Sequence, residues 1–246
     1  MRKLLLLVVG AALAGCGGHR HTAAPAAVLA AHAQRCVPGA LLSLGSPRLA
    51  YVGVAPRGAV ARRGSTTTKF GTRNVNGYPT VFAVTGEIVD GACKPRTYRV
   101  ELPIKPNGAT GFVAAGSLEI RTVATRIVVD LSARRLTLYR SGRRSLVATV
   151  AVGSPATPTP TGTYYVNQRL VAPDPKGPYG PAAIGISAFS TVLTGWVQGG
   201  PIAIHGTNEP WSIGHAVSNG CVRLPNATLL KLWRVAVAGT PVIIHG

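Results

Sequence analysis

Acidic side chains are scarce in this sequence of 246 residues. There are 7 Asp and Glu against 26 Lys and Arg, which gives a net charge of +19. Such a balance points to an anionic partner, and nucleic acid is one candidate. The charge is not concentrated, because residues 1–120 hold 14 basic and 4 acidic groups and residues 121–246 hold 12 and 3. No zinc-finger, helix-turn-helix or aromatic-platform signature accompanies it, so we expect no nucleic-acid partner. A diffusely basic surface suits an anionic polymer or a membrane equally well.

Charged residues of both signs make up only 13% of the chain, while Gly and Pro number 30 and 19. Many turns and few charges favour an all-β architecture over a helical bundle. Short apolar runs separated by breakers such as Asn76-Gly77 and Asn107-Gly108 fit that architecture. The sequence therefore predicts a mainly β protein.

Long hydrophobic runs are also missing at the start of the chain. The apolar stretch Leu4–Leu13 follows Arg2-Lys3 and is far below the ~20 residues that a membrane-spanning helix needs, which indicates a signal peptide. It ends in Leu13-Ala14-Gly15-Cys16, which resembles the bacterial lipobox. That resemblance implies a signal over residues 1–16, a lipidated Cys16, and an exported protein anchored at the outer face of the cytoplasmic membrane. An ordinary signal peptide cleaved nearby is the alternative, and residues 17–35 are interpreted as a tether.

Cysteine is limited to four residues. If Cys16 carries lipid, Cys36 and Cys93 flank one N-terminal region and can form a disulfide in an exported protein. Cys221 is then the unpaired thiol, reactive or buried. Disulfides of Cys36 or Cys93 with Cys221 remain open alternatives from the sequence alone.

Two β segments follow the tether. The stretch VELPIKPNGATGFVAAGSLEI in residues 36–120 resembles the last part of a bacterial SH3-like wall-associated module. The second segment, residues 122–246, starts with a hairpin (RIVVDL and RLTLY), continues through Pro- and Gly-rich loops over residues 154–185, and includes a short helix, Ala227–Val235. We expect Asn226 to cap that helix. The loops either line a groove or are surface irregularities without a role in function.

Residues 202–226 carry the chemistry. Cys221 is a candidate nucleophile, and a thiol needs a base or a positive environment to form a thiolate near neutral pH. His205 ends an apolar strand from which an imidazole can act as that base. Gly220 precedes the cysteine, so the backbone N–H groups of Gly220 and Cys221 can face a developing oxyanion.

The same segment resembles the catalytic domain of the L,D-transpeptidase (YkuD) family. The shared signature runs from His205-Gly206-Thr207 to Ser218-Asn219-Gly220-Cys221-Val222-Arg223, 16 residues from the histidine to the cysteine. The resemblance implies a β-sandwich with Cys221 as nucleophile and His205 as general base. It further implies that the Gly206 carbonyl orients the imidazole, since the only carboxylate in the segment is Glu209.

Substrate contacts follow from the motif positions. We assign Arg223, Ser218, Asn219 and Asn226 as candidate substrate-binding residues, with bracing of the loop as the alternative for Arg223 and Asn226. Many family members have a second histidine where this chain has Asn219. Purely structural alternatives remain for several residues. Cys221 can be an inert buried thiol and His205 a histidine of the core, and His215 and His245 are expected at the surface. Trp196 and Trp211 either pack in the core or line a groove.

The resemblance implies an activity on peptidoglycan stem peptides. Cys221 attacks the carbonyl before the terminal D-Ala, a thioester forms, and a second stem resolves it into a 3-3 cross-link. Hydrolysis of the thioester, an L,D-carboxypeptidase outcome, is the alternative, as is a non-catalytic wall-binding lipoprotein. We expect no metal or organic cofactor and a monomer.

Overall fold

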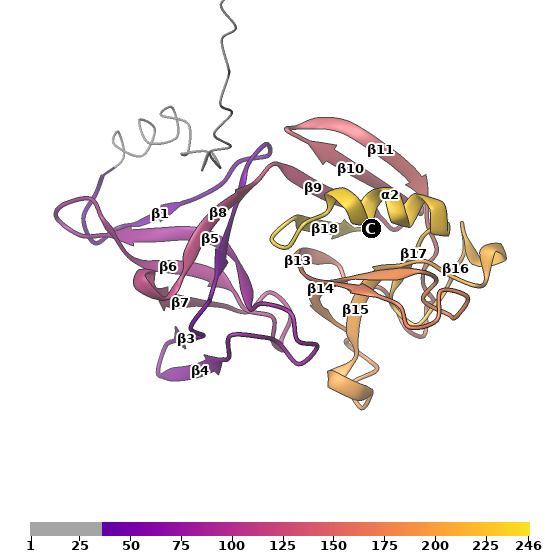
Figure 1. Cartoon of the computed structure of the whole chain (residues 1–246), viewed down its shortest axis with the longest axis horizontal. Coiled ribbons are helices and arrows are strands. Elements are labelled where there is room, and N and C mark those ends of the chain that lie inside the picture. Colours follow the sequence, from indigo (N-terminus) through magenta and orange to yellow (C-terminus); the bar gives the residue numbers. More distant parts are fainter. Residues whose placement is uncertain (1–35) are drawn as a thin grey trace, which may run out of the picture. The chain divides into compact units, whose positions relative to one another are not determined.

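The computed structural model of the protein describes residues 36–246, and residues 37–246 form one compact unit. The predicted signal peptide, Cys16 and the tether lie outside the described residues. Two eight-stranded sheets, a two-stranded sheet and one α-helix make up the regular structure of the described part (Figure 1). The prediction of a mainly β protein is confirmed. None of the helices in residues 36–246 has the length and apolar character to cross a membrane.

The first sheet uses the strands before residue 124. In chain order these are β1 (Leu41–Ser43), β2 (Ala50–Val54), β3 (Ala59–Arg63), β4 (Thr66–Phe70), β5 (Val81–Val89), β6 (Pro95–Glu101), β7 (Thr110–Ala114) and β8 (Glu119–Val123). Their order is β4-β3-β7-β6-β5-β2-β8, and β1 pairs with β5. Alternating residues such as Phe82, Val100 and Val113 are fully buried and form the core of this half. The SH3-like character of the segment stays a prediction.

The second sheet contains the catalytic motif. Its strands are β9 (Thr125–Asp130), β10 (Arg135–Arg140), β11 (Arg143–Thr149), β13 (Gly162–Val171), β14 (Ala182–Phe189), β15 (Pro201–His205), β17 (Val222–Arg223) and β18 (Pro241–His245), in the order β11-β10-β9-β18-β13-β14-β15-β17. The hairpin of β9 and β10 is antiparallel with Asp130 opposite Arg135, as predicted. A separate parallel pair joins β12 (Val152–Gly153) to β16 (Ala216–Ser218).

The prediction that residues 154–185 are loops was wrong over part of that range. Gly162–Val171 is a ten-residue strand, and β14 begins at Ala182. Tyr164, Tyr165 and Val166 are all buried there, so the aromatic and β-branched residues outweigh the preceding Pro- and Gly-rich sequence.

The one α-helix among the described residues, α2 (Asn226–Val235), packs Leu229 and Leu232 into the core of the second sheet. Pro225, not Asn226, occupies the N-cap position, and no side chain caps the helix. The prediction of an Asn226 cap was therefore wrong.

The two large sheets share a buried seam. Tyr165 is fully buried and donates its hydroxyl to the Val81 carbonyl (2.9 Å). Val52, Val81 and Val123 of the first half form one apolar cluster with Tyr165 of the second. Residues more than 80 positions apart therefore share one core within the compact unit.

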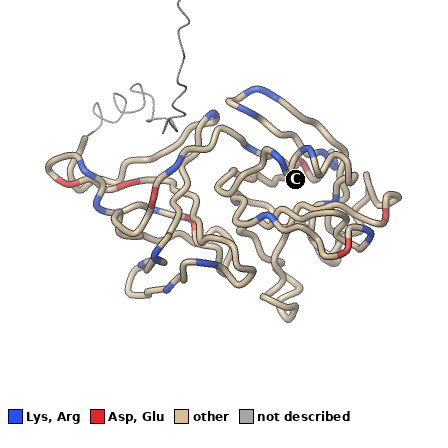
Figure 2. The backbone as a smooth tube through the Cα atoms, viewed as in Figure 1, with Lys and Arg blue, Asp and Glu red and all other residues tan. Residues whose placement is uncertain are grey.

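Basic side chains occur on strands and loops of both sheets, and acidic ones are sparse (Figure 2). This distribution agrees with the even spread of charge along the sequence.

Candidate active site

His205 is the last residue of β15, and Cys221 directly precedes the neighbouring strand β17. Strands β15 and β17 run parallel, with Ile204 opposite Val222 and His205 opposite Arg223. Ile204 and Val222 are fully buried in the core. Because side chains alternate along a strand, His205 and Arg223 project from the other face, and Cys221, one residue before Val222, lies on that face as well.

The His205 imidazole is buried, with 4% of its surface exposed. Its Nδ1 lies 2.5 Å from the Gly206 carbonyl oxygen. A carbonyl can only accept a hydrogen bond, so Nδ1 carries the proton and Nε2 is left with a free lone pair. Burial lowers the pKa of His205 to about 4, against the raising effect of the Gly206 carbonyl, and the nearby Arg223 charge lowers it further. The ring is therefore a neutral base at neutral pH.

Cys221 carries a free thiol, whereas Cys36 and Cys93 are both disulfide-bonded. This excludes the two alternatives in which Cys221 takes part in a disulfide. Its Sγ accepts a hydrogen bond from the Ala203 N–H (3.4 Å). Burial raises the pKa of the thiol, although the Ala203 N–H and the Arg223 charge act in the opposite direction. The resting pair is thus a thiol beside a neutral imidazole.

The turn before the cysteine is held by Ser218. Its hydroxyl donates to the Cys221 carbonyl (2.5 Å) and accepts the Gly220 N–H (3.2 Å). Gly220 has φ of +104°, and a Cβ there would lie 3.0 Å from Ile202 Cδ1, so only glycine fits without strain. The Gly220 N–H is engaged by Ser218 here, and its oxyanion role stays a prediction. The Cys221 N–H is the other donor of that predicted pair.

Three of the candidate substrate-binding residues hold the site together. Ser218 is buried and braces the turn, Arg223 forms an ion pair with Glu209 (2.5 Å), and Asn226 Oδ1 accepts the Thr207 N–H (2.8 Å). Asn219 is exposed beside the cysteine. Direct contact of these four residues with substrate stays a prediction.

Tyr179 is a site residue that the sequence did not single out. Its ring packs edge-on against His205, with 4.9 Å between the centroids, and 52% of its surface is exposed. The adjacent Gly180 has φ of +60° and lies so close to Gly206, Thr207 and Asn226 that a Cβ would collide with all three. Part of the loop between β13 and β14 therefore borders the site.

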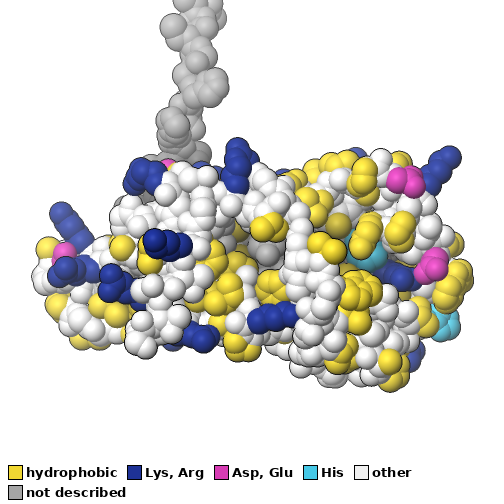
Figure 3. All heavy atoms as spheres, turned by 90° about the horizontal axis from the view of Figure 1, so that it is seen from below, with side chains coloured by type: hydrophobic (Ala, Val, Ile, Leu, Met, Phe, Trp, Pro, Cys, Tyr) yellow, Lys and Arg dark blue, Asp and Glu magenta, His cyan; other side chains and the backbone are white. Residues whose placement is uncertain are grey.

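Two tryptophans and two histidines that the sequence left as candidates lie at the surface. Trp196 and Trp211 are 51% and 64% exposed, so core packing is wrong for both, and His215 and His245 are exposed as predicted. Figure 3 shows one face of the molecule, where apolar side chains are interspersed with basic ones. No group of three His, Cys, Asp or Glu in residues 36–246 could hold a metal ion.

A free thiol, a neutral imidazole with an oriented tautomer and a glycine-containing turn define the site as that of a cysteine acyl-transfer enzyme. The L,D-transpeptidase catalytic domain model, YkuD, matches residues 124–244. The chain belongs to this L,D-transpeptidase (YkuD) family.

Two Bacillus proteins, both called YkuD and named as L,D-transpeptidases, are similar to the chain. The Bacillus subtilis protein is 33% identical over 58% of this chain and 84% of its own length. The Bacillus licheniformis protein is 37% identical over 50% of this chain and 67% of its own length.

Solved structures of L,D-transpeptidases also match. The Enterococcus faecium enzyme is 25% identical with a TM-score of 0.37, covering 49% of each chain, so this chain spans about half its length. The Mycobacterium smegmatis enzyme is 19% identical with a TM-score of 0.41, covering 68% of this chain and 90% of its own. With TM-scores below 0.5, these likenesses add nothing to the assignment.

Proposed function

We propose that the protein is a peptidoglycan L,D-transpeptidase that forms 3-3 cross-links through a thioester on Cys221. The observation that carries the proposal is the placement of His205 at the end of β15 and of Cys221 directly before the adjacent parallel strand β17, with the imidazole tautomer fixed by Gly206. The family membership and the names of the Bacillus relatives support the same reaction.

The first half-reaction starts from a neutral pair. As Cys221 Sγ attacks the carbonyl carbon of the donor stem, its proton passes to His205 Nε2 and the carbonyl oxygen becomes an oxyanion. The tetrahedral intermediate collapses by breaking the C–N bond, and the leaving D-Ala amine takes the proton back from His205. The product is a thioester on Cys221.

The second half-reaction uses the same imidazole. A side-chain amine of a second stem attacks the thioester, gives a proton to Nε2, and expels the thiolate, which recovers that proton. Water in place of the amine gives an L,D-carboxypeptidase, and both outcomes share the acyl-enzyme. The exposed Tyr179 beside His205 borders the space through which the acceptor would approach.

The location of the enzyme is part of the proposal. The lipobox-like sequence that ends at Cys16 supports an exported, lipid-anchored protein at the outer face of the cytoplasmic membrane, with its polymer substrate on the same side. The disulfide-bonded Cys36 and Cys93 fit an oxidising compartment.

Incubation with a purified disaccharide-tetrapeptide, followed by mass spectrometry, tests the activity. A dimer that has lost one D-Ala supports transpeptidation, whereas tripeptide alone supports the carboxypeptidase. Cys221→Ala is expected to abolish both products and the mass shift of the acyl-enzyme.

His215→Ala is the matched control, because this exposed histidine lies outside the site as described and its loss should leave product formation near the wild-type rate. Product formation by Cys221→Ala, or its complete absence in the wild-type protein, would contradict the proposal.

A further inference from the structure

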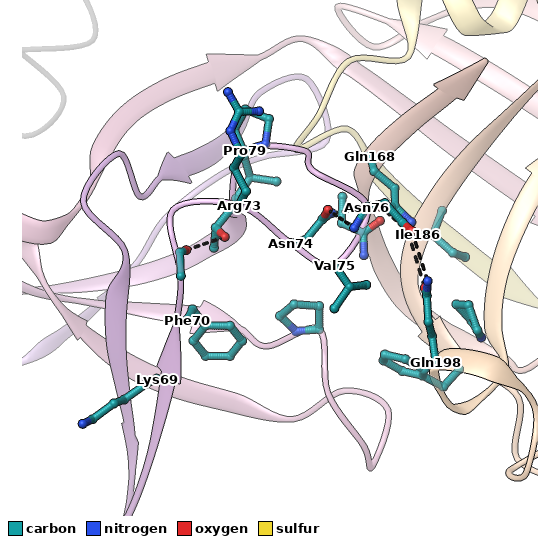
Figure 4. A pocket seen from close by; sticks show the side chains of 17 residues that line it. Lys69, Phe70, Arg73, Asn74, Val75, Asn76, Pro79, Gln168, Ile186 and Gln198 are labelled. Atoms are coloured by element: carbon teal, nitrogen blue, oxygen red, sulfur yellow. Dashed lines mark hydrogen bonds between the residues drawn. The ribbon is translucent and has the colours of Figure 1, made fainter.

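A cavity opens along the seam between the two large sheets. It measures about 390 Å³, within the range of small-molecule sites. Its lining contains neither Cys221 nor His205. Phe70, Arg73 and Asn76 come from the first half, and Gln168 and Gln198 from the second (Figure 4).

Neutral amides dominate the polar lining. Gln168 Oε1 accepts hydrogen bonds from Asn74 (2.9 Å) and Asn76 (3.0 Å), and Asn76 in turn pairs with Gln198 (3.1 Å). Figure 4 shows these amides grouped on one side of the cavity. Each amide offers both donors and an acceptor, so the group can exchange hydrogen bonds with hydroxyl or amide groups of a ligand.

The remaining wall is apolar. Phe70, Phe189, Pro103 and Pro201 line it, and they offer flat surfaces for C–H groups. Its lining includes no carboxylate. Of its two cations, Lys69 points away from the amides in Figure 4, and the Arg73 guanidinium donates a hydrogen bond to the Gly77 carbonyl. Amides on one side and rings on the other suit a neutral, polyhydroxylated ring better than an ion.

We infer that this cavity binds one sugar unit of a glycan chain, separately from the peptide that reacts at Cys221. The inference rests on the proposed function for the source of the glycan, because the stems that Cys221 would use are attached to one. Gln168 lies on β13 of the catalytic sheet, and Gln198 lies just before β15, which begins at Pro201 on the cavity wall and ends at His205. One strand thus links a glycan subsite to the catalytic base.

Titration of the protein with N-acetylglucosamine trisaccharide, followed by NMR of the Asn and Gln side-chain amides, tests the inference. Saturable shifts of the Asn76, Gln168 and Gln198 amides are expected. The same shifts are expected with Cys221→Ala, which separates binding from catalysis. Shifts confined to residues around Cys221, or cavity shifts with a free stem peptide and none with the sugar, would overturn it.

Two variants make the test sharper. Gln198→Ala, in an exposed loop, should weaken trisaccharide binding about tenfold, whereas Asn208→Ala removes an exposed amide outside the cavity and should not. Unchanged affinity in Gln198→Ala would show that the amides serve only to join the sheets.

Discussion

At the scale of single residues, the site combines a thiol and an imidazole that are both uncharged at rest. Burial acts on each of them in the direction that disfavours its charged form, and Arg223 alone adds a positive charge near both. This resting state differs from a thiolate–imidazolium pair, in which the thiol is already ionised at neutral pH. Proton transfer to His205 must therefore accompany attack by Cys221.

The pH dependence of alkylation distinguishes these two states. Because the pKa of Cys221 is raised, its reaction with iodoacetamide should keep rising about tenfold per pH unit through neutral pH and not reach a plateau there. The rate constant of alkylation is measured by mass spectrometry of samples quenched at successive times, from pH 5 to pH 9. The Cys221→Ala protein serves as the blank. A rate that is constant between pH 5 and pH 8 would indicate a preformed ion pair.

Asn226 supports the strand end that carries Gly206. Its replacement in Asn226→Ala leaves the buried Thr207 N–H without an acceptor, which should lower the free energy of unfolding by about 1–3 kcal/mol. Asn226→Asp keeps an acceptor oxygen and should lose much less. Urea denaturation of the three proteins provides the comparison, and equal stability of Asn226→Ala and wild type would show that the hydrogen bond contributes nothing.

At the scale of elements, the loop before β14 is fixed to the catalytic strand by a glycine. Gly180→Ala would place a Cβ 2.8 Å from the Thr207 nitrogen and force a side chain into φ of +60°. We expect a loss of about 2 kcal/mol in stability and reduced turnover, because Tyr179 would leave its place against His205.

Gly195→Ala is the control for that variant, since a Cβ at Gly195 meets no atom within 4 Å. The melting temperature and the rate at which the cross-linked peptidoglycan dimer forms should both be near wild type in Gly195→Ala. Both should be lower in Gly180→Ala. If Gly180→Ala kept full turnover, contact of this loop with the site would be unimportant for the reaction.

Sequence spacing sufficed for the elements that hold the motif but not for the contacts between loops. The His205 strand, the hairpin of β9 and β10 and the free Cys221 follow from local patterns of apolar residues and from the motif. An asparagine at the start of a helix predicts an N-cap from local rules. The Asn226 side chain instead accepts a hydrogen bond from the backbone N–H of Thr207, which lies 19 residues earlier in the chain. Tyr179 was missed for the same reason, because no sequence rule relates that loop to the strand end at His205.

At the scale of the whole described chain, a buried acid lies in the seam between the sheets. Glu101 is 6% exposed, and it accepts a hydrogen bond from the Ser187 hydroxyl (2.6 Å), which itself accepts the Tyr165 N–H. Burial raises the pKa of Glu101 to about 7, although the Ser187 bond acts against it. The folded protein therefore favours the protonated carboxyl.

The stability of the protein should depend on pH through this group. A folded pKa above the unfolded one gives stability that is complete below about pH 4 and is lost as pH rises to about 7. The loss amounts to about 3 kcal/mol. Glu101→Gln should remove this dependence, while Glu119→Gln, an exposed acid on β8, should keep it. Denaturation curves at pH 4.5, 6 and 7.5 give the free energy of unfolding of each protein. The same change of this free energy with pH in wild type and Glu101→Gln would contradict the role of Glu101.

The shared cluster of Val52, Val81, Val123 and Tyr165 has a practical consequence for recombinant work on this enzyme. A fragment that starts at residue 124, where the match to the catalytic domain begins, would expose the Tyr165 ring that the first half now covers. It would also uncover Gly239, whose backbone fits against Val52 only because it has no side chain. Such a fragment would expose an apolar surface and would aggregate or self-associate through it. A recombinant protein should therefore start before β1 and contain both halves.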